Sequence, residues 1–176
     1  MFESVQWERP QGLLAPTNEE RSDTLRGVPT AFDTRVAAYG VIVRSGQILL
    51  AHWNAYGTTN WTLPGGGLEF GEDPATAARR EILEETGYHV CLERLLGVDN
   101  AFYPAGKRMR SRGHHSFRVI YEARIDSGEL ANEANGTTDE ARWFPLDEVP
   151  GLERVKLVDV AIDMWRRQTV PHEEAV

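Results

Sequence analysis

The stretch from residue 63 to residue 88 constrains the fold of this chain more than any other, because three consecutive glycines precede a segment with clear helix-start and helix-stop signals. Asp73 suits the N-cap position, and Pro74 suits the first helical position, where its missing N–H costs nothing. Gly87 suits the position that follows a helix. The sequence therefore predicts a short strand, a glycine loop and a helix from Pro74 to about Thr86.

Three glutamates share one face of this expected helix, because they stand at i, i+3 and i+4 of a helix that turns about 100° per residue: Glu81, Glu84 and Glu85. Like charges at i, i+4 repel by roughly 0.2–0.5 kcal/mol, and the helix dipole disfavours anions at the C-terminal end. A hard divalent cation such as Mg²⁺, shared with substrate phosphates, would reverse this penalty. An ordinary solvated helix face is the alternative. The adjoining apolar stripe is expected from Ala75, Ala78 and Ile82.

The full spacing pattern favours the metal-binding interpretation. Every fixed position of the pattern G-x5-E-x7-R-E-U-x-E-E-x-G-U, where U is a bulky apolar residue, is matched by Gly66, Glu72, Arg80, Glu81, Ile82, Glu84, Glu85 and Gly87. This pattern resembles the Nudix box, and the chain is similar to the MutT-like Nudix hydrolases, which act on a nucleoside diphosphate linked to another moiety. The departure is Tyr88 at the last U, where the family usually has an aliphatic residue.

The resemblance implies an α+β fold, with an α/β/α sandwich around a mixed β-sheet, in a domain over residues 35–170. It implies Mg²⁺ as the cofactor, with Mn²⁺ as a substitute, and a small nucleotide as the substrate. The implied reaction is attack of water on one phosphorus of a P–O–P bridge. Such phosphoryl transfer needs positioning and charge neutralisation more than covalent chemistry by the protein.

The position of each residue in the pattern implies its role. The implied metal ligands are Glu81, Glu84, Glu85 and the backbone carbonyl of Gly65. Glu81 is implied either as a ligand or as the base that takes a proton from water. Arg80 is expected to hold the carboxylates through a bidentate pair, and Glu72 to stabilise the junction between loop and helix or to bind metal indirectly.

The general base and the substrate contacts are less specified. Family members differ in their base, and acids of a later loop are candidates: Asp139, Glu140 and Glu133. A basic cluster could hold a substrate phosphate or could be a solvated loop: Lys107, Arg108, Arg110, Arg112, His114 and His115. Aromatic residues could stack on a base or belong to the core: Trp53, Tyr56, Trp61, Phe102 and Tyr103. The leading substrate-contact candidates are Arg108, Arg110, Arg112, Tyr103 and Glu140.

Composition limits the kinds of partner that the chain is expected to bind and the compartment in which it is expected to lie. The chain has 176 residues and a formal net charge of −8, which suits one domain and argues against sequence-independent binding to nucleic-acid backbones. The single Cys91 cannot form an internal disulfide, and its apolar surroundings in the sequence predict a buried small hydrophobe. The sequence shows neither a membrane-length apolar run nor a signal peptide, so a cytoplasmic protein is expected.

The rest of the chain alternates strand and turn signals before a final amphipathic helix. Strands are expected at 35–44, 47–53, 61–63, 90–98, 116–125 and 139–146, and the helix at 155–167. Polar loops are expected at 54–60, 99–113 and 127–138. Residues 1–34 are expected to form an irregular arm, either anchored by Trp7, Leu13 and Leu14 to its own domain or to the second subunit of a homodimer, or loosely ordered. Residues 171–176 are expected to form a frayed tail.

Two other functions on the same fold stay open. A non-hydrolytic member of the family could bind a nucleotide sugar as a sensor or regulator, although such proteins usually carry a damaged box. An isomerase of isoprenoid diphosphates would need a catalytic cysteine, for which Cys91 is the candidate. The pattern indicates the reaction, while the loops choose the substrate, so ADP-ribose, oxidised nucleoside triphosphates, dinucleoside polyphosphates and sugar nucleotides all remain open.

Overall fold

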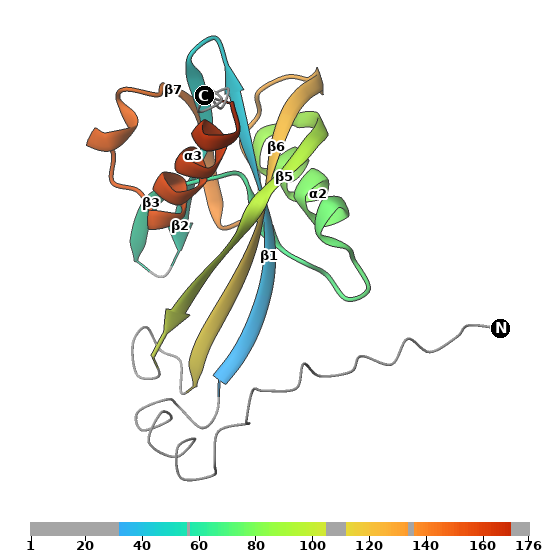
Figure 1. The fold of residues 1–176 in the computed structure, drawn as a ribbon, viewed down its shortest axis with the longest axis vertical. Coiled ribbons are helices and arrows are strands. Elements are labelled where there is room, and N and C mark those ends of the chain that lie inside the picture. The colour runs from blue at the N-terminus through green and yellow to red at the C-terminus, as the bar shows by residue number, and fades with distance from the viewer. Residues whose placement is uncertain (1–31, 56, 105–111, 134–135, 170–176) are drawn as a thin grey trace, which may run out of the picture.

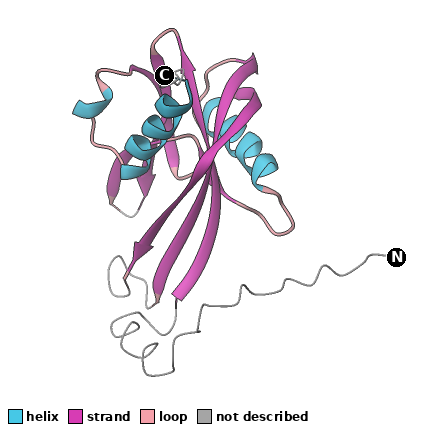
Figure 2. Ribbon diagram, viewed as in Figure 1, coloured by secondary structure: helices cyan, strands magenta, loops and turns pink. Residues whose placement is uncertain are grey.

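The computed structural model describes residues 32–55, 57–104, 112–133 and 136–169. Across these residues a mixed β-sheet lies between two helices, α2 (Pro74–Thr86) and α3 (Lys156–Thr169) (Figure 1). The strands are β1 (Phe32–Arg44), β2 (Gln47–Ala55), β3 (Thr58–Thr62), β4 (Gly65–Gly67), β5 (Tyr88–Tyr103), β6 (Gly113–Gly128) and β7 (Thr138–Pro145). A short 3-10 helix, η1 (Val149–Gly151), follows β7 (Figure 2). The expected α+β sandwich with a mixed sheet is confirmed.

Strand β1 is the centre of the sheet, and both of its faces are covered. Ala37 and Val41 pack in the core cluster that contains the buried face of α3. The alternate residues Ala38 and Ile42 pack in the clusters that contain the buried face of α2. Because side chains of a strand alternate between faces, this double cover explains why residues 36–43 of β1 form a continuous apolar run.

The three glycines form a strand, so the prediction of a glycine loop is wrong. Strand β4 pairs antiparallel with β1, with Gly67 opposite Ala37 and Gly65 opposite Tyr39. Gly65 has a φ of 138°, and a Cβ built there would lie 2.3 Å from the carbonyl oxygen of Ala38, so glycine is required for this close approach. The glycines form a strand because they pair with an edge of β1. A local sequence pattern does not reveal that this edge is available.

Several strands are longer than the sequence predicts, because pairing with neighbouring strands extends them. Strand β1 starts earlier than expected, at Phe32, which pairs in parallel with Gly113 of β6. Most of the loop expected at 54–60 is instead a hairpin of β2 and β3. The first part of the loop expected at 99–113 is the end of β5, which pairs with β6 as far as Tyr103.

Cys91 is exposed, so the prediction of a buried cysteine is wrong. It alternates along β5 with Val90 and Leu92, whose side chains pack in the cluster on the α2 side of the sheet. Cys91 therefore faces away from α2, and it pairs across the strands with Arg124.

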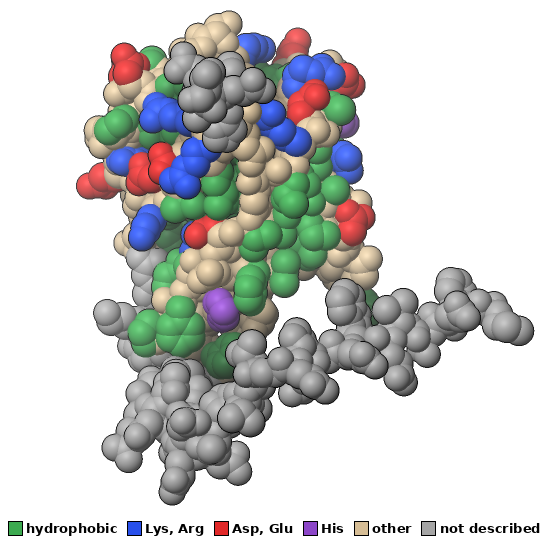
Figure 3. Space-filling model, in the orientation of Figure 1, with side chains coloured by type: hydrophobic (Ala, Val, Ile, Leu, Met, Phe, Trp, Pro, Cys, Tyr) green, Lys and Arg blue, Asp and Glu red, His purple; other side chains and the backbone are tan. Residues whose placement is uncertain are grey.

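Beyond the two helices, β1, β5 and β6 continue together as a three-stranded ribbon (Figure 1). Large apolar side chains are exposed along it, namely Phe32, Val36, Val98, Phe102 and Phe117. Hydrophobic side chains accordingly gather over the lower part of the coloured surface in Figure 3. Within the described part of the chain, no helix has the length and hydropathy that a membrane crossing requires.

Helix α2 begins and ends where the sequence predicts. The Asp73 side chain accepts hydrogen bonds from the backbone N–H groups of Ala75 (2.9 Å) and Thr76 (3.0 Å). Gly87 ends the helix in the left-handed conformation, with a φ of 73°. The buried face consists of Ala77, Ala78, Ile82, Glu85 and Thr86, so Ala77 takes the place predicted for Ala75.

We expect Asp73→Ala to lower the free energy of unfolding by about 1 kcal/mol, because two N–H groups at the start of α2 lose their acceptor. Asp73→Asn is the matched control, since Asn caps a helix about as well as Asp, and it should stay close to the wild type. Urea denaturation of the three proteins measures the difference. Equal stability of the Ala variant and the wild type would show that this cap contributes nothing.

Candidate functional site

Glu85 is a buried carboxylate near the C-terminal end of α2, with 7% of its surface exposed. One of its oxygens accepts a hydrogen bond from the backbone N–H of Gly65 (2.8 Å), and the other accepts one from the Thr138 hydroxyl (2.5 Å). Burial raises the pKa of Glu85 to about 7, although both hydrogen bonds act in the opposite direction. A negative charge at this position therefore lacks compensation by a nearby cation.

Glu81 approaches β4 from the α2 side. A Cβ built on Gly66 would lie 2.4 Å from the carboxyl carbon of Glu81, although the backbone of Gly66 does not have a positive φ. Glycine at this position therefore makes room for the carboxylate rather than for an unusual backbone conformation. The Glu81 side chain is 19% exposed, and its burial raises the pKa of the carboxyl.

Arg80 connects three carboxylates of this region. Its Nε and Nη2 atoms donate to the two oxygens of Glu72 at 3.0 and 2.8 Å, which is a bidentate pair. Its Nη1 atom donates to Glu81 (3.0 Å) and to Glu84 (3.1 Å), and Nη2 also donates to the carbonyl oxygen of Gly67 (3.1 Å). The bidentate pair expected from the sequence thus exists, but its partner is Glu72 rather than one of the implied metal ligands.

Glu72 lies at the junction between β4 and α2. Besides the contact with Arg80, it accepts a hydrogen bond from the backbone N–H of Glu69 (2.9 Å). The Arg80 guanidinium holds the pKa of Glu72 below its usual range. Glu84 differs from the other acids because its side chain is 48% exposed. Glu72 therefore contacts both the segment that follows β4 and the side chain of Arg80 on α2, whereas Glu84 is open to solvent.

The donor chemistry of this region fits a hard divalent cation. Carboxylate oxygens come from Glu81, Glu84 and Glu85, and the Gly65 peptide lies directly beside Glu85. The raised pKa of Glu85 fits a carboxylate whose compensating cation is not part of the protein. Within the described residues, no three acidic, histidine or cysteine side chains converge closely enough to hold an ion in this conformation. Arg80 donates hydrogen bonds to two of the three box carboxylates, those of Glu81 and Glu84.

Among the later acids, Glu133 is linked to the buried carboxylate of Glu85 through Thr138. The backbone N–H of Thr138 donates to Glu133 at 3.3 Å, and the hydroxyl of the same residue binds Glu85. The charge of Glu133 also contributes to the raised pKa of Glu85. Thr138 therefore joins the loop before β7 to the end of α2.

The other two candidates for the base have partners of their own. Asp139 accepts a hydrogen bond from the side-chain amide of Asn54 (2.6 Å), and its other oxygen lies 2.6 Å from Nδ1 of His52. These contacts hold the pKa of Asp139 below its usual range, with Asn54 as the larger cause. Glu140 forms an ion pair with Arg142.

Two of the expected substrate contacts lie toward the end of the ribbon. The Tyr103 hydroxyl accepts a hydrogen bond from Arg118 (3.0 Å), and Arg112 pairs with Asp33 (3.0 Å). Strand β1 rises about 3.3 Å per residue, so the backbone of Asp33 lies about 13 Å from that of Ala37, which pairs with β4. Neither of these two contacts involves a box carboxylate. Three residues of the expected basic cluster, Lys107, Arg108 and Arg110, lie outside the described residues, as does Tyr56.

The aromatic candidates are divided between core and ribbon. Trp61 packs against the α3-side core, with its ring centroid 4.6 Å from that of Phe144 and 4.9 Å from that of His52. On the ribbon, the ring centroids of Phe102 and His115 lie 6.2 Å apart. None of these contacts involves the box carboxylates.

Sequence reasoning missed two residues of the site, Thr138 and Arg35. Thr138 is 2% exposed and binds Glu85 across the sheet. Arg35, on β1, places its guanidinium against Gly67. Neither residue carries a local sequence signal, because only the pairing of distant strands brings Thr138 to α2 and Arg35 to β4.

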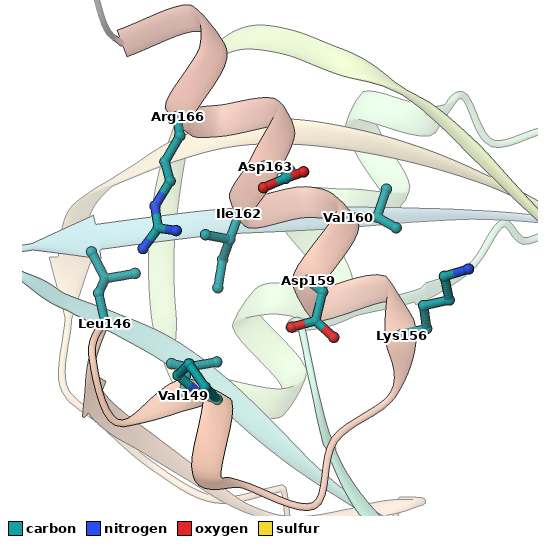
Figure 4. Close-up of a pocket in the computed structure, with 9 residues that line it drawn as sticks. Leu146, Val149, Lys156, Asp159, Val160, Ile162, Asp163 and Arg166 are labelled. Atoms are coloured by element: carbon teal, nitrogen blue, oxygen red, sulfur yellow. The ribbon is translucent and has the colours of Figure 1, made fainter.

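A separate pocket of about 310 Å³ lies between α3 and η1 (Figure 4). Its floor is apolar and its rim is charged: Leu146, Val149 and Ile162 line the floor, and Lys156, Asp159, Asp163 and Arg166 lie at the rim. Because α3 and α2 cover opposite faces of the sheet, this pocket is not part of the carboxylate region.

Comparison with known proteins is consistent with this geometry. A family model described as "NUDIX domain" matches residues 33–165. The Mycobacterium tuberculosis protein named "Putative mutator protein MutT4" is 33% identical over 144 residues, which cover 78% of this chain and 51% of that protein. The Bacillus subtilis protein named "Putative ADP-ribose pyrophosphatase YjhB" is 30% identical over 127 residues, which cover 72% of this chain and 56% of that protein. The chain thus spans about half the length of these curated relatives.

Solved structures share the fold over most of the described residues. A MutT NUDIX hydrolase from Burkholderia pseudomallei is 31% identical with a TM-score of 0.62, and the match covers 75% of this chain and 98% of that one. A NUDIX hydrolase from Nitrosomonas europaea is 25% identical with a TM-score of 0.65, and the match covers 77% and 90% of the two chains. The intact box, the fold and the family match agree: the chain belongs to the NUDIX domain family.

Proposed function

We propose that this chain hydrolyses the pyrophosphate bond of a small nucleoside diphosphate derivative with Mg²⁺ as cofactor and Mn²⁺ as a substitute. The observation that carries the proposal is the position of Glu85, a buried carboxylate with a raised pKa that binds the Gly65 peptide. Oxygen donors around an uncompensated negative charge suit a hard divalent cation, which such enzymes share with substrate phosphates.

In this proposal the metal ligands are Glu81, Glu84, Glu85 and the Gly65 carbonyl. When bound, the cation supplies neutralisation of phosphate charge and a lowered pKa of the attacking water. Arg80 acts on Glu81 and Glu84 by holding their carboxylates in position. Arg80 needs its own anchor for this purpose, and the bidentate pair with Glu72 provides it.

The residue that takes the proton from water is Glu81 or an acid of the later loop. Among the later acids we favour Glu133, because Thr138 links it to Glu85. Asp139 and Glu140 are less suited, because each already has a close partner, in the amide of Asn54 and the guanidinium of Arg142.

The names of relatives indicate several substrates, so the substrate needs a direct test. They include an ADP-ribose pyrophosphatase from Bacillus subtilis, an 8-oxo-dGDP phosphatase from Homo sapiens and an NAD-capped RNA hydrolase from Vibrio parahaemolyticus. A panel of ADP-ribose, oxidised nucleotides, dinucleoside polyphosphates and sugar nucleotides, assayed with Mg²⁺ for product release, identifies the class. Tight binding of one compound without any product would instead indicate a non-hydrolytic binding protein.

We expect Glu84→Gln and Glu85→Gln each to reduce kcat by about 100-fold or more on the best compound of the panel, because each removes a charged oxygen ligand worth several kcal/mol. Glu93→Gln is the matched control, since Glu93 is an exposed acid on β5 that pairs with Arg124. Circular dichroism checks that the variants are folded. Unchanged turnover in both box variants would contradict the proposed site.

The raised pKa of Glu85 predicts a pH dependence of stability in the metal-free protein. Between the ordinary value of 4.5 and the folded value of about 7, the folded state binds more protons than the unfolded state. The free energy of unfolding should therefore fall as the pH rises through this window. Glu85→Gln should reduce that slope, and Glu93→Gln should keep it. Urea denaturation between about pH 5 and pH 8 measures the slope, and an identical slope in Glu85→Gln would refute the assignment.

A further inference from the structure

Arg35 lies over the last glycine of β4. A Cβ built on Gly67 would lie 2.9 Å from one terminal nitrogen of the Arg35 guanidinium and 3.1 Å from its Nε. Gly67 does not have a positive φ, so its backbone would accept other residues. The lack of a side chain at position 67 therefore makes room for the guanidinium, as the lack of one at Gly66 makes room for Glu81.

The two glycines place an anion and a cation on opposite faces of one short strand. Neighbouring residues of a strand point to opposite faces, so Glu81 lies on the face of Gly66 and Arg35 on the face of Gly67. The strand between them carries no side chain. Both charged groups therefore lie close to the backbone of the same short strand.

The Arg35 guanidinium is oriented but not neutralised by its protein partners. The hydroxyl oxygen of Tyr39, a residue that is 9% exposed, accepts a hydrogen bond from it. Among the described residues, no carboxylate forms an ion pair with Arg35, although Arg80, Arg94 and Arg118 each have one. Arg35 is exposed to solvent as well, so its donors remain available to a ligand.

Arg80, in contrast to Arg35, has no guanidinium donor left for a ligand. Its donors are used by Glu72, Glu81, Glu84 and the carbonyl of Gly67. A substrate with a pyrophosphate group would meet a chain of net charge −8 and a cluster of acids. A second cation beside the box lowers the electrostatic cost of bringing phosphate there, and a guanidinium matches phosphate oxygens with two parallel donors.

We propose that Arg35 binds the pyrophosphate group of the substrate over the glycine strand, and that Gly67 is required to leave space for it. This inference rests on the proposed function, since it assigns a phosphate contact within the same site.

Calorimetric titration with inorganic pyrophosphate in the presence of Mn²⁺ tests the contact directly. We expect Arg35→Gln to weaken pyrophosphate binding about tenfold, because a charge-assisted hydrogen bond is lost, and Arg35→Lys to weaken it less. Gly67→Ala should weaken it as well, because the new Cβ displaces the guanidinium while the charge remains. Arg44→Gln is the matched control, since Arg44 stands at the other end of β1 over the ring of Trp143 and should bind as the wild type does.

Two further measurements separate this contact from the metal site and from the reaction. Mn²⁺ affinity, measured by electron paramagnetic resonance without pyrophosphate, should not fall in Arg35→Gln. With the best nucleotide of the panel, the variant should show a raised KM. Wild-type binding of pyrophosphate in Arg35→Gln, no pyrophosphate binding by the wild type, or a parallel loss of Mn²⁺ affinity would each overturn the proposal. Pyrophosphate binding that depends on Arg35 in a chain that cleaves no nucleotide would instead overturn the proposed function alone.

Discussion

The close packing of β4 between β1 and α2 is the interaction on which the site depends. Gly65 allows the backbone of β4 to approach that of β1, because any Cβ there would overlap the carbonyl of Ala38. Gly66 and Gly67 then admit a carboxylate on one face and a guanidinium on the other. A strand without side chains thus lets charged groups from two elements come within reach of the same peptide atoms.

The charges around this strand fall into two groups. Glu72, Glu81 and Glu84 share the guanidinium of Arg80, so their repulsion is largely balanced within the protein. Glu85 is held apart by the Gly65 N–H and the Thr138 hydroxyl, and neither of these carries a full charge. Burial is the main cause of the raised pKa of Glu85, whereas the hydrogen bond from Arg80 is the main cause of the lowered pKa of Glu72. This difference also indicates where an external cation would stabilise the folded protein most.

The fold keeps these groups in place through packing on both faces of the sheet. The α3 side forms the larger buried cluster, which contains the buried residues Leu157, Val158, Ala161 and Ile162 of that helix. The α2 side buries a smaller set of residues and leaves the carboxylate end of the helix beside β4 and β7. The pocket between α3 and η1 lies on the other face of the sheet, so it and the carboxylate region are separate features. The charges, rather than cavity shape, identify the site.

The sequence by itself determined the ends of α2, the spacing of its glutamates and the family, because caps and helical periodicity depend on residues close together in the chain. It also predicted most strands and the final helix, with errors at their ends. Only the tertiary structure decided that the glycines form a strand, that Cys91 is exposed, and that Thr138 and Arg35 join the site. Each of those features depends on which distant strand lies alongside, and hydrogen bonds between strands far apart in sequence leave no local pattern.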